Sequence, residues 1–167
     1  DIFFTPHYTL PYNLPCVSVA TIHDLIHLKY RPKFGAFGKI YAKRMMQHAC
    51  RQSKTILTDS ENSKQDILQY FPFCADKIRI IHPAVDKDIF KSYPPDKISA
   101  FRNEHRLQDE FVLYAGALKP HKNPTVLIEI ANQLKFPVIL ASNDNQNFIE
   151  KILPGLKNQS MMKIINI

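Results

Sequence analysis

The sequence predicts an α/β protein with parallel β-sheets, divided between parts of two similar domains. Short apolar runs rich in β-branched residues alternate with segments of good helix formers, and this alternation is typical of βαβ units. A connector-like stretch at residues 83–97, stiffest at Pro94-Pro95, interrupts the alternation, which then begins again. We therefore expect residues 1–93 to hold one domain portion with the connector at its end, and residues 94–167 to hold the next.

Both ends of the chain lie in strand-like sequence. The chain opens on "DIFFT" and closes on "MMKIINI". We expect both domain portions to be truncated there, so that the chain is a fragment of a longer protein.

The first half contains two expected helices between strand-like runs. Residues 34–53 contain no proline and many good helix formers, which favours a helix. Ser60 is a residue type that commonly caps a helix, and Pro72 would stop that helix after Tyr70. The strand-like runs in this half are residues 1–5, 16–22, 55–58 and 77–82.

The second half repeats this pattern. Prolines and polar turn residues separate its apolar runs, which again predicts strands joined by helices. The expected strands are residues 111–116, 137–142 and 162–167. The expected helices are residues 96–106 and 124–135, with residues 147–157 helical in part.

Composition narrows the class of protein. The chain has 167 residues, 45% of them hydrophobic, and a formal net charge of +7. This charge favours acidic partners such as phosphates, anionic lipids or nucleic acids. No apolar stretch approaches the roughly 20 residues of a membrane span. Cys16, Cys50 and Cys74 are too far apart for a Cys-x-x-Cys metal site, so we expect reduced thiols in a cytosolic protein.

The stretch "FVLYAGALKPHKN" (111–123) joins a strand to a group of cations. Gly116 ends the apolar run and allows backbone to approach a ligand closely. Asn123-Pro124 is a typical helix start, and a helix N-terminus beside cations favours an anion such as phosphate. A polar turn with solvated lysines remains the alternative, because the stretch matches neither a Walker A loop nor a Gly-x-Gly-x-x-Gly fingerprint. The potential cations are Lys119, His121 and Lys122.

A second candidate site lies in "TIHDLIH" (21–27). Its His-Asp-x-x-His spacing is close to the zinc-protease pattern, but His23 follows a strand and an aspartate replaces the longer glutamate base. His23 and Asp24 fall at the carboxyl end of an expected parallel strand, where open α/β sheets bind ligands. A histidine satisfied by hydrogen bonds within a turn is the alternative.

The interval from Leu25 to Thr58 contains no acidic residue. A solvated helix face explains such an interval in most proteins, and contact with anionic lipid head groups or with a phosphorylated acceptor is the more specific possibility. The sequence shows no recognised nucleic-acid-binding motif, so we do not expect nucleic acid as a partner. The basic residues in this interval are Lys29, Arg31, Lys33, Lys39, Lys43, Arg44, Arg51 and Lys54.

Five stretches, taken in order, resemble the group 1 glycosyltransferases of family 4, which have the GT-B fold. The resemblance covers nearly the whole chain. The stretches are "DIFFTPHYTLP" (1–11), "VATIHDL" (19–25), "TDSENSKQDI" (58–67), "IRIIHPAVDKDIF" (78–90) and "FVLYAGALKPHKN" (111–123).

The resemblance implies a retaining glycosyltransferase with two Rossmann-like domains. The N-terminal domain would hold a glycan or lipid-linked acceptor, and the C-terminal domain would hold a nucleotide-sugar donor. No metal and no other cofactor is implied. The protein would be cytoplasmic, with peripheral contact to the inner face of the membrane through the basic segment at residues 29–54.

The resemblance also implies roles for individual residues. His23 matches the family histidine that contacts the donor sugar, whereas Gly116 and Lys122 match the loop against the donor diphosphate. Many members carry arginine directly after this glycine, where Ala117 stands here. Either Lys119 or His121 substitutes for this arginine, or the chain belongs to a lineage that does without it.

The sequence departs from the family pattern at two further places. Ala84 stands where the family usually has glycine, and the Glu-x7-Glu segment of the family would lie beyond Ile167. We therefore expect the isolated chain to be inactive. Two other possibilities remain open, a truncated and catalytically inactive remnant and a basic α/β module that binds phosphate or nucleic acid.

Overall fold

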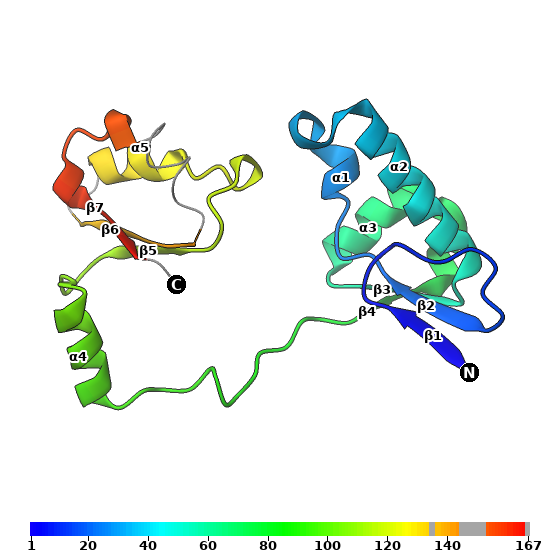
Figure 1. The fold of residues 1–167 in the computed structure, drawn as a ribbon, viewed down its shortest axis with the longest axis horizontal. Coiled ribbons are helices and arrows are strands. Elements are labelled where there is room, and N and C mark those ends of the chain that lie inside the picture. Colours follow the sequence, from blue (N-terminus) through cyan, green and yellow to red (C-terminus); the bar gives the residue numbers. More distant parts are fainter. Residues whose placement is uncertain (134–135, 144–152, 166–167) are drawn as a thin grey trace. The chain divides into compact units, whose positions relative to one another are not determined.

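The computed structural model describes residues 1–133, 136–143 and 153–165. The chain divides into two compact units, Asp1–Phe90 and Lys91–Ile167, which we call the N-terminal and C-terminal units. Each unit contains one parallel β-sheet with helices packed on it (Figure 1), so the predicted α/β class with parallel sheets is confirmed. The border after Phe90 lies close to the predicted border after residue 93.

The N-terminal unit is a four-stranded sheet in the order β1-β2-β3-β4, and every pair of neighbours is parallel. Parallel neighbours need crossover connections, which are supplied here by helices between β2, β3 and β4. In Figure 1, these helices lie on one side of the sheet. The elements are β1 Ile2–Thr5, β2 Val17–Thr21, α1 Ile26–Lys29, α2 Arg31–Gln52, β3 Thr55–Thr58, α3 Glu61–Tyr70, a 3₁₀ helix Pro72–Lys77 and β4 Ile78–Ile80.

The helix-covered face of this sheet forms the core of the unit. Ala20, Ile56 and Ile78 stand side by side in the strand register and are buried beneath helix residues such as Met46 and Ile67. Two free thiols, those of Cys50 and Cys74, belong to the same core. A hydrogen bond between these thiols, together with burial, raises the pKa of Cys50. Apolar burial of this kind, at about 25 cal/mol per Å², provides most of the stabilisation of such a sheet.

The opposite face of the N-terminal sheet is apolar but uncovered at the β1 edge. Ile2 and Val17 are register partners, and Phe4 lies two residues further along the same face. Their side chains are exposed to 72%, 45% and 57%, respectively. The strand β1 is also an edge strand of the sheet within the described chain.

The C-terminal unit has a three-stranded parallel sheet in the order β5-β6-β7. The helix α5 buries Leu127 and Ile128 in a cluster with Val138 and Leu140 of β6. The elements are α4 Pro95–Glu104, β5 Val112–Ala115, a 3₁₀ turn Pro120–Lys122, α5 Val126–Gln133, β6 Val138–Ala141, 3₁₀ turns Leu153–Gly155 and Gln159–Met161, and β7 Met162–Ile165.

Each strand predicted from the sequence is present, and the helices differ from the prediction in detail. The helix predicted over residues 34–53 begins earlier, at Arg31, and is kinked at Gly35, which has φ 56° and ψ 177°. The short helix α1 and the 3₁₀ helix before β4 were not predicted. A helix was predicted over part of residues 147–157, and residues 147–152 of this segment lie outside the described residues. The same holds for residues 134–135, at the end of the helix predicted at 124–135, and for residues 166–167, at the end of the strand predicted at 162–167.

No helix within the described residues is long and apolar enough to cross a membrane.

The cap of α3 gives a first test. The Ser60 hydroxyl oxygen accepts a hydrogen bond from the backbone N–H of Ser63 at 3.1 Å, as the sequence predicts. We expect Ser60→Ala to lower the free energy of unfolding by about 0.5–2 kcal/mol, because it leaves a backbone donor unsatisfied. Urea unfolding monitored by circular dichroism measures this change. Ser92→Ala, in the exposed connector, is the matched control, and equal stability of the two variants would contradict the capping role.

Candidate functional site

The carboxyl ends of all four strands of the N-terminal sheet carry polar groups. Pro6 follows β1 directly and Asp59 follows β3 directly, whereas His23 and His82 each lie two residues beyond β2 and β4. Because parallel strands point the same way, their carboxyl ends meet at one edge of the sheet. Open α/β sheets bind their ligands at this edge.

Hydrogen bonds link these four groups in the order of the strands. His23 Nε2 lies 3.0 Å from the carbonyl oxygen of Pro6, and His23 Nδ1 lies 2.9 and 3.0 Å from the two carboxylate oxygens of Asp59. His82 Nδ1 lies 3.1 Å from the carbonyl oxygen of Asp59. The chain of contacts therefore crosses the edge from β1 to β4 without skipping a strand.

This arrangement constrains the protons of His23. The Pro6 carbonyl can only accept, so the Nε2 atom must donate a proton to it. The ionised Asp59 carboxylate also only accepts, so a proton on Nδ1 completes the second hydrogen bond. The doubly protonated ring is the form that satisfies both contacts.

The ring of His23 is held but still accessible. The side chains of His23 and Asp59 are 53% and 34% exposed, so solvent screens their attraction. An ion pair this exposed contributes about 1 kcal/mol or less to stability. The contact therefore orients the ring more than it stabilises the fold, and a ligand can reach the ring from solvent.

Other polar groups near this edge have local partners. Asp24 Oδ1 accepts a hydrogen bond from the backbone N–H of Ile26 at 2.9 Å and so fixes the start of α1. The ring of His27 packs edge-on against Tyr8, with centroids 5.7 Å apart. Burial, followed by repulsion from His27 and His23, lowers the pKa of His7 and favours its uncharged form.

The near-match to the zinc-protease pattern has a different geometry here. His23 lies in the loop after β2, whereas His27 lies in α1, so the two do not share one helix face. Among the residues that the structure describes, no group of three or more His, Cys, Asp or Glu side chains could hold a metal ion.

The C-terminal unit has its own candidate site at the end of β5. Gly116 has φ 137°, a conformation that side-chain-bearing residues rarely adopt, and its N–H donates to the carbonyl of Ala141 at 3.0 Å. A Cβ atom at Gly116 would lie 3.7 Å from Lys122 Nζ. The structure therefore brings the backbone of Gly116 and the ammonium of Lys122 together, as the phosphate interpretation requires.

The other cations of this loop are arranged differently. Lys119 is exposed, and its carbonyl accepts the N–H of Lys122 at 2.9 Å to close the 3₁₀ turn. His121 is partly buried. Lys122 is exposed and forms no ion pair within the described chain.

The helix start predicted at Asn123-Pro124 is wrong by about two residues, since α5 begins at Val126. Asn123 has φ 48°, in the left-handed region, and its side-chain oxygen accepts from the Thr125 hydroxyl at 2.8 Å. The first residues after Lys122 thus form a turn, and Lys122 lies further from the helix than we predicted.

Sequence reasoning missed Asp59, His82 and the Pro6 carbonyl. Pro6 and Asp59 directly follow predicted strands, as His23 does, whereas His82 is the last residue of the strand predicted at 77–82, which ends at Ile80 in the structure. The rule that ligand sites gather at the carboxyl ends of parallel strands could have selected them, had it been applied to every strand and not to β2 alone.

Comparison with known proteins identifies the family of this chain. Residues 2–89, more than half of the chain, match the family described as Glycosyltransferase Family 4. The serotype-specific mannosyltransferase WbdA of Escherichia coli is 24% identical over 151 residues, and the O-antigen chain mannosyltransferase B of the same organism is 24% identical over 147. Each match covers 84% of this chain but only 18% and 38%, respectively, of the relative.

Solved structures show the same fold. HepE of Anabaena, crystallised with UDP-glucose, superposes with a TM-score of 0.69 at 19% identity, over 90% of this chain and 42% of its own. WaaG, a glycosyltransferase involved in lipopolysaccharide biosynthesis, has a TM-score of 0.69 at 13% identity, over 99% of this chain and 48% of its own. These similarities confirm the GT-B fold expected from the sequence. The family match shows that this chain belongs to Glycosyltransferase Family 4.

Proposed function

We propose that the protein containing this chain is a retaining glycosyltransferase that moves a sugar from a nucleotide-sugar donor to a glycan or lipid-linked acceptor. The observation that carries this proposal is the ammonium of Lys122 beside the Cβ-free backbone of Gly116 at the end of β5. Family membership, the UDP-glucose bound by HepE and the mannosyltransferase activity named for the two relatives support it.

In this proposal the C-terminal unit binds the donor diphosphate. The absence of a side chain at Gly116 leaves room for phosphate oxygens close to the backbone. Negative charge grows on the leaving phosphate as its bond to the anomeric carbon breaks. The Lys122 ammonium would stabilise this charge, and Lys119 and His121 would add to it in place of the arginine that Ala117 replaces. This electrostatic role requires no protein nucleophile.

The N-terminal unit would contribute His23. A donor-sugar hydroxyl that displaced the Pro6 carbonyl from Nε2 would receive a charge-assisted hydrogen bond, about twice as strong as a neutral one. Asp59 keeps the ring in the orientation and proton state that make this possible. His23 is thus the sugar-contacting group of the proposal, and Asp59 is its positioning residue.

Lys122 provides the most direct test. In the full-length protein, Lys122→Ala should lower kcat more than it weakens donor binding, since the charge on the leaving phosphate is greatest in the transition state. Loss of a charged hydrogen bond of about 1.5–3 kcal/mol corresponds to a decrease of roughly ten- to a hundredfold. Steady-state kinetics and donor calorimetry measure the two effects.

Lys119→Ala is the comparison for Lys122→Ala, and its effect should be smaller because no atom of Lys119 lies within 4 Å of a Cβ atom built at Gly116. Both lysines are exposed, so neither variant should change the melting temperature noticeably. If Lys122→Ala keeps wild-type turnover and donor affinity, the loop is an ordinary turn and the proposed diphosphate site is wrong.

Asp59 tests the other site. Asp59→Asn keeps the shape of the side chain but removes its charge, so we expect turnover to decrease about tenfold or more while stability changes by less than about 1 kcal/mol. Asp59→Glu should restore part of the turnover. Asp109→Asn, which breaks an exposed ion pair with Arg102, is the control. Equal turnover of Asp59→Asn and wild type would contradict the positioning role.

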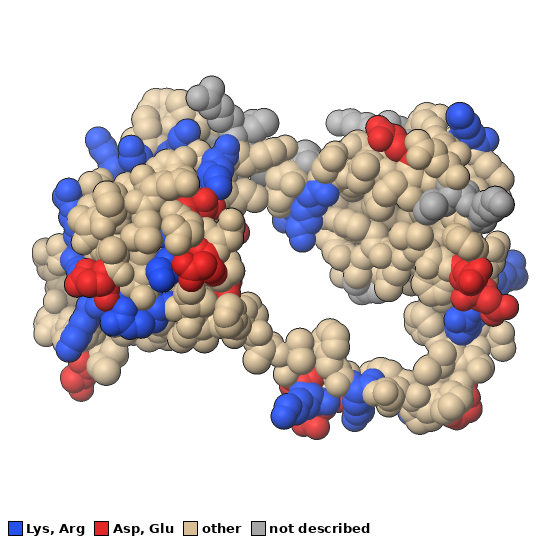
Figure 2. All heavy atoms as spheres, turned by 180° about the vertical axis from the view of Figure 1, so that it is seen from behind, with Lys and Arg blue, Asp and Glu red and all other residues tan. Residues whose placement is uncertain are grey.

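A second proposal concerns an anionic membrane surface as a partner. Phe37, Ile40 and Tyr41 of α2 are exposed to 90%, 52% and 58%, and with exposed Arg44 they follow the i, i+3, i+4, i+7 spacing of one helix face. Aromatic and aliphatic side chains beside cations are typical of helices that lie on lipid head groups. Figure 2 shows lysine and arginine side chains along the upper and outer edges of the N-terminal unit. The protein would then be peripheral, at the cytoplasmic face of the membrane.

Liposome co-sedimentation tests the membrane proposal. Changing Lys39, Lys43, Arg44 and Arg51 to Glu should weaken binding of the full-length protein to vesicles that contain phosphatidylserine, because each cation near such a surface contributes about 1 kcal/mol. Charge reversal of exposed Lys87, Lys91 and Lys97 in and after the connector is the control and should have a smaller effect. Unchanged binding of the α2 variant would refute the membrane role of this helix.

A further inference from the structure

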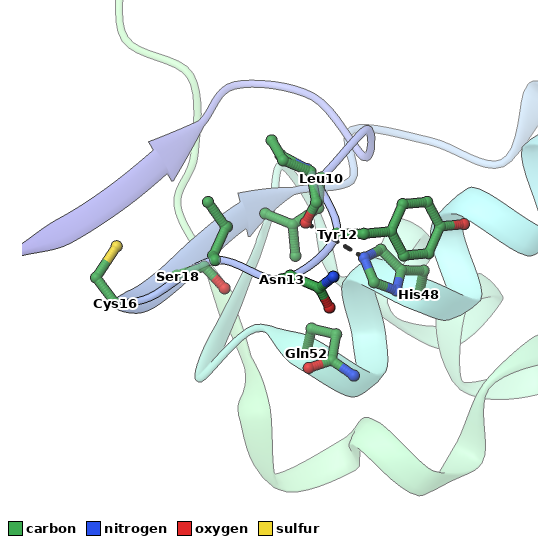
Figure 3. Close-up of a pocket in the computed structure, with 9 residues that line it drawn as sticks. Leu10, Tyr12, Asn13, Cys16, Ser18, His48 and Gln52 are labelled. Atoms are coloured by element: carbon green, nitrogen blue, oxygen red, sulfur yellow. Dashed lines mark hydrogen bonds between the residues drawn. The ribbon is translucent and has the colours of Figure 1, made fainter.

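A pocket of about 250 Å³ lies in the N-terminal unit, between the loop that joins β1 to β2 and the last turns of α2. Figure 3 shows Tyr12 and Asn13 from the loop beside His48 and Gln52 from α2. Ser18, near the start of β2, forms part of its wall.

The pocket is separate from the candidate site at the strand ends. Ser18 marks the amino end of the sheet, whereas His23 lies beyond its carboxyl end. A strand the length of β2 spans about 15 Å at 3.3 Å per residue. A ligand in the pocket is therefore well away from a group that reacts beside His23.

Two aromatic rings in the wall of the pocket contact each other. The rings of Tyr12 and His48 are tilted by 35° to one another, with centroids 4.1 Å apart. Asn13 adopts φ 60°, a left-handed conformation that asparagine tolerates better than most residues. Tyr12 remains 65% exposed, so much of its ring is available to a ligand.

The chemistry of the lining is neutral and rich in hydrogen-bonding groups. No lysine, arginine, aspartate or glutamate lines the pocket, although the chain carries a net charge of +7. Asn13 and Gln52 are exposed, and their side-chain amides form no hydrogen bond within the described residues, so both are available to a ligand. Each amide offers donors and an acceptor together, which suits a hydroxyl group that also does both.

These features select among ligand classes. A phosphate or carboxylate would find no cation in the pocket, and a purely apolar ligand would desolvate amides without replacing their hydrogen bonds. A sugar ring presents hydroxyl groups to the amides and a C–H face to the tyrosine ring. The volume, below the roughly 300–1,000 Å³ of sites for drug-sized ligands, suits one sugar residue and not a whole nucleotide sugar.

We propose that this pocket binds one neutral sugar residue of the acceptor glycan, away from the point of transfer. The proposal rests on the proposed function for the identity of the acceptor. A glycan held at this distance from His23 would be anchored through a sugar residue that lies behind its growing end. Longer acceptors would therefore bind better than short ones.

Binding to the 167-residue chain tests the proposal without any transfer. We would titrate a neutral manno-oligosaccharide, chosen because the relatives are mannosyltransferases, and follow backbone amide shifts by NMR. Shift changes should concentrate at Asn13, His48 and Gln52. Tyr12→Ala and Gln52→Ala should each weaken binding about tenfold, and Tyr93→Ala, an exposed tyrosine of the connector, should not.

Gln52→Ala keeps the test decisive if Tyr12→Ala disturbs the loop, because Gln52 is exposed at the end of α2. Absence of shifts at the pocket, or equal affinity of Gln52→Ala and wild type, would overturn the proposal. If the full-length protein transfers sugar but the pocket binds none, this inference alone fails. If the pocket binds sugar and no transfer occurs, the proposed function alone fails.

Discussion

Parallel pairing of strands is the constraint on which the rest of this structure depends. Because each strand runs in the same direction as its neighbours, every connection must return across the sheet, and every carboxyl end arrives at the same edge. In the N-terminal unit this brings Pro6, His23, Asp59 and His82 into one line of hydrogen bonds, although they are far apart in the sequence. In the C-terminal unit the same rule places Gly116 and its loop at the end of β5.

The two edges use different chemistry. The N-terminal edge holds the His23 ring between two acceptors, whereas at the C-terminal edge the Lys122 ammonium lies beside the backbone of Gly116 and forms no ion pair with another described residue. The hydrogen bonds of His23 fix the orientation of its ring, whereas the ammonium of Lys122 is available to bind an anion. The pocket at the opposite end of the N-terminal sheet is lined by no lysine or arginine among the described residues, and its neutral amides suit hydroxyl groups.

Local signals in the sequence were sufficient for the strands and for the cap at Ser60, because β-branched runs, prolines and capping serines act through their immediate neighbours. They failed at Asn123, at Asp59 and at Gly35. Asn123 is a residue type that commonly caps a helix, but its side-chain oxygen accepts a hydrogen bond from the Thr125 hydroxyl, and α5 begins later. Asp59 directly precedes the Ser60 cap in the sequence, and only the register of β2 beside β3 brings its carboxylate to His23. The kink of α2 at Gly35 follows from a positive φ that composition alone does not specify.

The uncovered face at β1 has a consequence for how this chain behaves in solution. Ile2, Phe4 and Val17 present an apolar surface next to an edge strand whose backbone groups lack a neighbour on one side in the described chain. Such an edge is a template for pairing with another chain, and contiguous apolar surface promotes association. The isolated chain should therefore show concentration-dependent self-association through β1.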